Sequence, residues 1–123
     1  MKEFTRVFTD ENGETHFEDV KIELLPVNFA PPAPPLNLSA FKDAKRFGFV
    51  NAPIGWSGDW HPTPKCQVFV YISGQIEAKV SDGEVRVFGP GSITLLEDTT
   101  GKGHKSRVVG NQEAFCVVIQ IED

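Results

Sequence analysis

The sequence predicts an all-β fold in which many short strands form a barrel or a sandwich. Seven runs in the second part of the chain are rich in β-branched and aromatic residues, which favour strands. The breaks between them carry Ser-Gly, Ser-Asp-Gly, Gly-Pro-Gly, Thr-Thr-Gly-Lys-Gly and Gly-Asn, which are typical turn sequences. We expect strands at Phe47–Val50, Val68–Ile72, Gln75–Val80, Val85–Phe88, Ile93–Leu96, His104–Val109 and Ala114–Ile121.

Two further strands are predicted at the start of the chain. Residues 1–10 alternate weakly between apolar and polar side chains and end in Asp-Glu-Asn-Gly, a turn signal. Residues 16–25 follow, with apolar side chains spaced mostly by two. We therefore expect these two segments to pair as a β-hairpin.

A proline-rich segment, Phe29–Leu36, follows the predicted hairpin with the sequence FAPPAPPL. Its proline density excludes a helix and a central strand, so we expect an extended, polyproline-like arm. Two interpretations are open: a PxxP ligand for a partner domain, or a stiff arm laid along the domain. We favour the second, because Phe29 and Leu36 give the arm apolar ends.

One stretch has helical spacing. Leu38, Phe41 and Ala44 are three residues apart and Ser39 is a candidate cap, which predicts a short helix over Asn37–Lys45. A chain of 123 residues fits one domain. Within that domain, we expect residues 1–45 to form a hairpin and an arm packed on a barrel formed by residues 46–123.

Composition is that of a globular protein, with 40% hydrophobic and 24% charged residues. The net charge of −5 argues against a nucleic-acid partner, because phosphate binding needs a surplus of Lys and Arg on one face. No apolar run approaches the ~20 residues that span a bilayer, and the charged start is unlike a signal peptide. We therefore expect a cytoplasmic protein without a membrane partner, in which Cys66 and Cys116 are buried thiols rather than a disulfide.

The stretch Gly55–Gly74, with the sequence GWSGDWHPTPKCQVFVYISG, carries the main functional signal. In a regular strand, alternate residues from position 67 onward share one face. Positions 61 and 63 join that face if the proline-containing segment stays extended. Polar groups at one end of a face and aromatic rings at the other predict a ligand pocket. The predicted pocket residues in this stretch are His61, Thr63, Gln67, Phe69 and Tyr71.

This stretch resembles the first motif of the cupin superfamily, and particularly that of small bacterial cupins of unassigned function. The motif runs Gly, five residues, His-x-His, three or four residues, Glu, six residues, Gly. The spacing matches throughout, from Gly55 through His61 to Gly74. Two identities differ, because Thr63 stands where the second His is usual and Gln67 stands where the Glu is usual.

The second cupin motif is matched more weakly. It runs Gly, five residues, Pro-x-Gly, two residues, His, three residues, Asn, and here Gly101 and His104 fit. Thr99 replaces the Pro and Val108 replaces the Asn, and the leading glycine is best matched by Gly91, two residues further out. The resemblance covers roughly the second half of the chain.

What the resemblance implies is a cupin-type double-stranded β-helix, a small jelly-roll barrel of two packed sheets that is often dimeric. In metal-binding cupins the matched side chains face inward and hold a divalent metal, which by position implies His61, Gln67 and His104 here. Thr63 and Gln67 offer neutral oxygens in place of an imidazole and a carboxylate, so this ligand set is weaker. We expect either one divalent ion of Zn, Ni, Fe or Mn, or no metal.

Other side chains near these motifs receive simpler interpretations. Trp56 and Trp60 are candidates to wall the cavity, although the parity of Trp60 also allows it to pack outward. We interpret Glu97 and Asp98 as ordinary solvated turn acids rather than as groups at the barrel mouth. His16 lies outside both motifs, and we interpret it as structural.

Three functions fit these observations. We favour a degenerate cupin pocket that binds a small polar ligand, with weak or absent metal binding. The alternative is a divalent-metal-dependent enzyme, of isomerase, lyase or oxygenase type, acting on a small metabolite. The third is a dimerising scaffold. A homodimer is expected in each case, from the resemblance and because the last strand is apolar on both faces.

Overall fold

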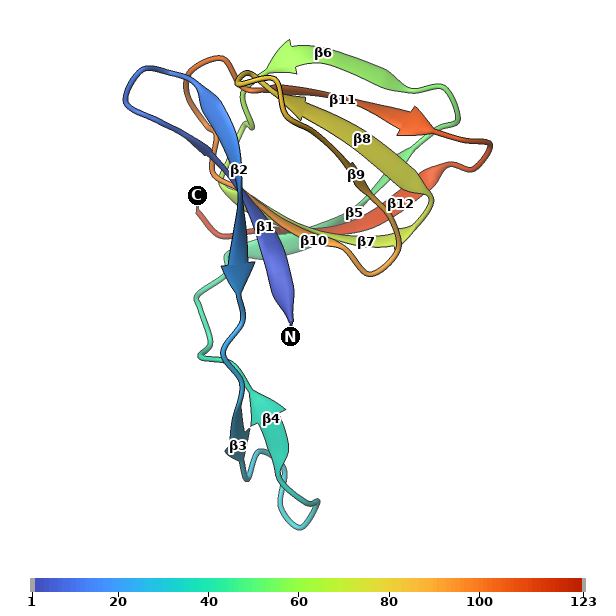
Figure 1. Ribbon diagram of the computed structural model, residues 1–123. Helices are drawn as coiled ribbons and strands as arrows, with labels where there is room; N and C mark the ends of the chain where they lie inside the picture. The colour runs from blue at the N-terminus through green and yellow to red at the C-terminus, as the bar shows by residue number, and fades with distance from the viewer. Residues whose placement is uncertain (1, 123) are drawn as a thin grey trace.

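Two β-sheets face each other across an apolar interior in the computed structural model of the chain, which describes residues 2–122 (Figure 1). The strands are β1 (Glu3–Thr9), β2 (Thr15–Lys21), β3 (Leu25–Val27), β4 (Leu36–Leu38), β5 (Arg46–Ala52), β6 (Ser57–His61), β7 (Gln67–Ser73), β8 (Gln75–Val80), β9 (Val85–Phe88), β10 (Ile93–Leu96), β11 (His104–Val109) and β12 (Ala114–Gln120).

The larger sheet has six strands in the order β2–β1–β10–β7–β12–β5, and the smaller has four in the order β6–β11–β8–β9. Most neighbours are antiparallel, and β1 pairs with β10 in parallel. The chain crosses from the first sheet to the second at Gly74, between β7 and β8. Gly74 has φ +75°, and a Cβ there would lie 2.3 Å from the Glu113 carbonyl oxygen, so this corner requires glycine.

The core lies between the two sheets and is built from the inward-facing positions of both. Tyr71 stacks on Phe88 with ring centroids 5.5 Å apart, and Phe17 meets the same Phe88 ring edge-on at 5.9 Å. Val80 and Cys116 are completely buried beside them. Alternation along each strand, expected from the sequence, therefore supplies one continuous core.

The strand predictions agree closely with the structure. β8, β9, β10 and β11 begin and end at the predicted residues, and the predicted N-terminal hairpin is present as β1 and β2. That hairpin is an integral part of the large sheet, because β1 pairs with β10. β6 was not predicted as a strand. Its polar, glycine-containing sequence SGDWH has low strand propensity, but it pairs along β11.

The predicted helix over Asn37–Lys45 is wrong. Residues 2–122 contain no helix, so none is long and apolar enough to cross a membrane. The helical spacing covers only three apolar residues, and a segment this short cannot offset the cost of helix nucleation without tertiary packing. The segment instead begins with β4, which pairs with β3, and continues without regular structure to β5.

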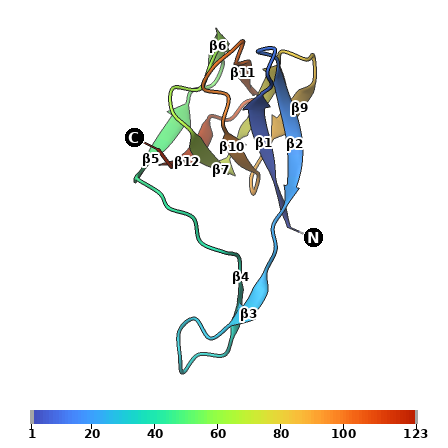
Figure 2. The same cartoon turned by 90° about the vertical axis from the view of Figure 1, so that its left-hand side faces the viewer.

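The proline-rich arm extends away from the barrel (Figures 1 and 2). We expected it to lie along the domain, but its apolar side chains contact each other instead, as in the Phe29–Phe41 pair with ring centroids 6.2 Å apart. The ends of the arm, Phe29 and Leu36, are 54% and 52% exposed. The arm of a single chain therefore leaves its apolar surface uncovered.

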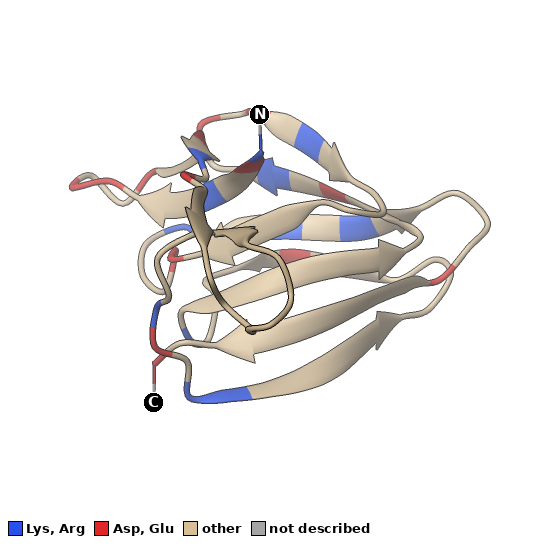
Figure 3. Ribbon diagram, turned by 90° about the horizontal axis from the view of Figure 1, so that it is seen from below, with Lys and Arg blue, Asp and Glu red and all other residues tan. Residues whose placement is uncertain are grey.

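The outer face of the six-stranded sheet is apolar over the strands β10, β7, β12 and β5. Figure 3 shows that the part of this face formed by β10, β7, β12 and β5 is almost free of charged residues, whereas β1 and β2 carry several. Phe49 stacks on Phe115 at 5.9 Å and meets Phe47 edge-on, and Phe47 and Phe49 are 73% and 64% exposed. The inner face of β12 is covered within the domain, and its outer face is open in the single chain.

Candidate functional site

A cavity of about 260 Å³ opens between the two sheets. All six predicted pocket residues contribute to its lining: His61, Thr63, Gln67, Phe69, Tyr71 and His104. The remaining walls are mostly apolar side chains from both sheets, and Trp56 stands among them. The two sequence motifs, about forty residues apart in the chain, therefore meet in one concave surface of the kind that holds small ligands.

The two motif histidines are partners across neighbouring strands. His61 at the end of β6 pairs with His104 at the start of β11, and their ring centroids are 4.8 Å apart. Gly103 makes this approach possible, because it has φ +71° and a Cβ there would lie 2.1 Å from the His61 carbonyl oxygen. A larger residue at 103 would separate the two strands where the imidazoles meet.

A buried carboxylate orients His104. Asp98 is fully buried, and it accepts hydrogen bonds from the Nδ1 of His104 and from the Oγ1 of Thr63, both at 2.7 Å. A carboxylate without a proton can only accept, so Nδ1 of His104 carries the hydrogen and Nε2 carries the lone pair. Thr63, in the position where cupins usually have a second His, thus fixes the carboxylate.

His61 has the same tautomer for a different reason. Its Nδ1 lies 2.6 Å from the backbone carbonyl oxygen of Asp59, which can only accept. Nε2 of His61 is therefore also an acceptor in the neutral ring. Within residues 2–122 neither Nε2 atom has a hydrogen-bond partner, so the cavity offers two imidazole acceptors side by side.

The β7 residues supply the floor and one further polar group. Tyr71 is buried, its hydroxyl lies 3.4 Å from Thr94 Oγ1, and burial raises the pKa of the phenol, which stays neutral. Phe69 continues the aromatic surface beside it. The Oε1 of Gln67 accepts a hydrogen bond from Nε2 of Gln120 at 3.1 Å. The pocket therefore combines an aromatic floor with the polar side chains of His61, Thr63, Gln67 and His104 at one end.

The residues present do not fit a tightly bound divalent metal. In the part of the chain that the structure describes, no cluster of three His, Cys, Asp or Glu side chains is placed to hold an ion. Two imidazoles are available, but the oxygen of Gln67 is already engaged and the carboxylate of Asp98 is turned to Thr63 and His104. Sites that retain an exchangeable position usually have three strong protein ligands.

Asp98 is the functional residue that sequence reasoning missed. Its interpretation as a solvated turn acid is wrong, because it is 0% exposed. The alternation of β10 carried the missed signal, because Thr94 and Leu96 line the cavity and Asp98 continues their parity. Glu97 has the opposite parity and forms an ion pair with Arg6 at the surface.

The two tryptophans have different positions. Trp56 lines the cavity, as the sequence allowed. Trp60 is 41% exposed, and the Nζ of Lys105 lies 5.5 Å from its ring centroid in a cation–π contact. In the single chain, Trp60 therefore points outward and does not wall the cavity.

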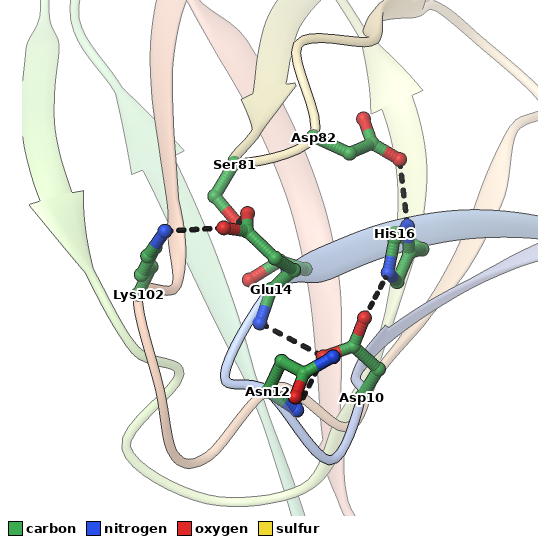
Figure 4. Close-up of polar contacts among 8 residues, drawn as sticks. Asp10, Asn12, Glu14, His16, Ser81, Asp82 and Lys102 are labelled. Atoms are coloured by element: carbon green, nitrogen blue, oxygen red, sulfur yellow. Dashed lines mark hydrogen bonds and ion pairs between the residues drawn. The ribbon is translucent and has the colours of Figure 1, made fainter.

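His16 lies in a separate polar cluster, where the β1–β2 turn meets the β8–β9 turn (Figure 4). Its two ring nitrogens lie 2.7 Å from Asp10 and 2.7 Å from Asp82, and these hydrogen bonds raise its pKa. Glu14 beside it contacts Ser81 and Lys102. The cluster ties the turns of the two sheets together, which agrees with a structural interpretation of His16.

Neither cysteine forms a disulfide in the structure. Cys116 is fully buried, and burial raises its pKa to about 11. Cys66 is half-buried, and its pKa is also raised, mainly by burial. Both groups are therefore protonated thiols near neutral pH, as expected of small hydrophobic residues.

Comparison with models of protein families and with curated proteins finds no sequence match. Solved structures do match in shape. The cupin domain of Cnp3 from Schizosaccharomyces pombe gives a TM-score of 0.55 at 12% identity, over 100% of this chain and 86% of that one. A cupin 2 conserved barrel domain protein from Salinispora arenicola gives 0.51 at 16% identity, over 82% and 76%. The predicted all-β jelly-roll fold of the cupin type is confirmed.

Proposed function

We propose that this chain, which has the cupin fold, binds a small polar ligand in the cavity between its sheets without a resident metal. The observation that supports the proposal is the pair of imidazoles, His61 and His104, each with Nδ1 engaged and Nε2 available. Two acceptors 4.8 Å apart by ring centroid can bind one donor-bearing group together. A neutral imidazole with a free Nε2 lone pair can also act as a general base toward a bound group.

The size and lining of the cavity limit the ligand. A volume of about 260 Å³ is at the small end for ligand pockets, which fits a molecule of about ten heavy atoms. The floor of Phe69 and Tyr71 suits an apolar body, and the histidine end suits its polar head. The pocket residues act here by binding and orienting the ligand.

The proposal is tested by thermal shift of the untagged protein against a library of small carboxamides, hydroxy acids and amino alcohols. A ligand at one hundred times its Kd stabilises the native state by about 2.7 kcal/mol, which is readily measured as a rise in Tm. We expect the rise to be lost in His61→Ala and in His104→Ala and kept in His16→Ala, whose ring lies in the other cluster. A rise that both pocket variants keep would overturn the proposal, as would the absence of any hit.

A divalent-metal-dependent enzyme is the second candidate, and one observation favours it. A carboxylate that accepts from the Nδ1 of a histidine, as Asp98 does from His104, commonly orients metal-binding imidazoles. Against it stands the ligand set, with two strong ligands only. Elemental analysis of untagged protein decides between them. We expect well below one metal ion per chain, and a stoichiometric ion that His104→Ala removes would establish the second candidate.

We also propose a homodimer that buries the outer face of the six-stranded sheet. The support is the exposed, uncharged aromatic surface of Phe47, Phe49 and Phe115, together with the exposed apolar arm, which projects from the same side of the barrel (Figures 1 and 3). Contiguous apolar surfaces of this kind are typical of contacts between proteins. In a symmetric dimer, the sheet face and the arm of the second copy are both available to cover the same surfaces of the first.

Sedimentation equilibrium at micromolar concentration tests the dimer. We expect Phe49→Ser to weaken the dimer at least tenfold. Val87→Ser provides the control, because Val87 is 52% exposed on the other sheet and should leave the dimer intact. A wild-type monomer at these concentrations would overturn this part of the proposal.

A further inference from the structure

We propose that Arg46 and Gln120 hold the side-chain amide of Gln67 in the orientation that presents its N–H donor, and not its oxygen, to the cavity. This inference rests on the proposed function, because it names the polarity of the same pocket. It predicts a ligand with an uncharged head group that carries both an acceptor and a donor, such as a primary carboxamide.

The three side chains form a ladder across the six-stranded sheet. Gln120 on β12 is paired in register with Arg46 on β5 and with Gln67 on β7. The ladder runs from the exposed edge of the sheet at Arg46 to the cavity at Gln67, which is 8% exposed. Directly opposed residues on neighbouring strands are close enough to bond, so register alone brings these groups together.

The hydrogen-bond donors and acceptors on each side chain decide the orientation of the two amides in this ladder. A guanidinium can only donate, and the Nε of Arg46 donates to the Oε1 of Gln120 at 2.5 Å. The Nε2 of Gln120 must then point to Gln67, where it donates to Oε1 at 3.1 Å. The amide oxygen and nitrogen have similar outlines, but only this arrangement satisfies both contacts.

Gln67 is left with its NH₂ group. No side chain or backbone group in residues 2–122 accepts a hydrogen bond from this nitrogen, and the residue lines the cavity. Thr15 Oγ1 is the one buried side-chain polar atom without a partner in residues 2–122, so the unpartnered Gln67 nitrogen is open to the cavity, where a ligand acceptor can bond to it. With the two imidazole acceptors, the polar end of the cavity offers donors and acceptors to one neutral group.

The same orientation explains why the ligand set does not suit a cation. A glutamine binds a metal ion through its oxygen, and here that oxygen is engaged by Gln120 while the positive end of the amide dipole faces the cavity. Turning the amide would therefore improve cation binding without adding any residue to the cavity.

Arg46→Glu tests the ladder from its exposed end. A carboxylate at 46 can only accept, so Gln120 must donate to it and present Oε1 to Gln67. Gln67 then donates to Gln120 and turns its own oxygen to the cavity. Arg46→Lys is the matched control, because an ammonium can only donate and leaves the amides as they are. The probe is Co²⁺ alone, titrated at pH 7.5 and followed by its visible absorption.

We expect Arg46→Glu to bind Co²⁺ at least tenfold more tightly than Arg46→Lys, and we expect Gln67→Met in the Glu background to abolish the gain. Gln120→Glu reaches the same turned amide by a second route, because its carboxylate accepts from both neighbours, and it should gain Co²⁺ affinity too. Equal affinities in folded Arg46→Glu and Arg46→Lys would overturn the proposal, and so would a gain that survives Gln67→Met.

A second measurement uses benzamide as the probe of the unmodified protein. We expect benzamide to shift the side-chain amide resonances of Gln67, measured by NMR, in the wild type and in Arg46→Lys but not in Arg46→Glu. Benzamide shifts of the same size in all three proteins would count against the oriented amide. If the Co²⁺ and benzamide results contradict the oriented amide, histidine-dependent ligand binding is unaffected. If the library screen finds no ligand, the Co²⁺ comparison still tests the orientation of the amide. The two failures are therefore distinguishable.

Discussion

Asp98→Asn removes the charge at the centre of the buried network while keeping the shape of the side chain. The Asp98 carboxylate accepts two hydrogen bonds of 2.7 Å, from Thr63 and from His104, in a fully buried position. A hydrogen bond to a charged group contributes about 1.5–3 kcal/mol net, and a neutral one about 1 kcal/mol. An asparagine can satisfy both partners with neutral bonds, so the expected loss is about 2 kcal/mol.

Urea unfolding at pH 7.5 measures this loss directly, and thermal unfolding should show a Tm lower by roughly 8 °C, since about 4 °C corresponds to 1 kcal/mol for a domain of this length. Asp59→Asn is the control. Asp59 is exposed, and within residues 2–122 its carboxylate accepts only from the neighbouring backbone N–H of Trp60, so the expected change is within about 0.5 kcal/mol. In a Thr63→Val background the loss from Asp98→Asn should shrink by about half. An Asp98→Asn protein as stable as the wild type would refute the reasoning.

Three further predictions concern other parts of the molecule. Hydrogen bonds to two carboxylates raise the pKa of His16 above its usual 6.5, so the stability that protonated His16 contributes is complete below pH 6.5 and disappears as the pH rises through the raised pKa. In thermal unfolding, His16→Gln should therefore cost about 0.5 kcal/mol at pH 6 and almost nothing at pH 9. An equal loss of stability at both pH values would contradict this prediction. Gly103→Ala should lower the free energy of unfolding by at least about 3 kcal/mol, because of the positive φ and the collision with the His61 carbonyl. Gly83 also has a positive φ but has open space around it, so Gly83→Ala should cost about 1–2 kcal/mol. Similar losses of stability in the two variants would refute the role of the close approach of residue 103 to His61. The thiol of Cys116, with a pKa of about 11, should react with a thiol reagent at pH 8 only at the rate of unfolding, and rapid labelling of the native protein would contradict its burial.

Local signals in the sequence were enough to predict most of the fold. Strand propensity and turn residues located β8, β9, β10 and β11 without error, because each is short and has Gly, Ser or Asp within two residues of both ends. β6 was missed because pairing along β11, and not its own composition, makes it a strand. The position of the proline-rich arm was predicted wrongly. The apolar residues of the arm indicate that it packs against another surface, but the sequence does not show which surface that is.

The candidate site was predictable to the extent that it depends on position within one strand. Parity alone placed Gln67, Phe69 and Tyr71 on one face, and the motif spacing added His61 and His104. What parity cannot reveal is a contact between strands. Asp98 follows β10 and His104 begins β11, so the parity of either strand does not show that the two side chains meet across the turn.

The contact of Gln67 with Gln120 was hidden for the same reason. It depends on β12 lying between β5 and β7 in a register that brings residues 46, 120 and 67 to one level. A one-residue shift of that register would turn Gln120 to the outer face and leave Gln67 free to present either end of its amide. The orientation that we propose for the Gln67 amide thus depends on the strand order and register, and not only on the residues that line the cavity.

Alternation also separates the two proposed functions of β7. Gln67, Phe69 and Tyr71 face the cavity, while Val68 and Val70 face the apolar outer surface. The pocket and the proposed dimer surface therefore lie on opposite faces of the same strand. Substitution of an outer aromatic side chain on β5 should dissociate the dimer without moving the imidazoles, which lie on the opposite sheet. Ligand binding that persists in a monomeric variant would show that each chain carries a complete pocket, and its loss would show that dimer contacts hold β7 in place.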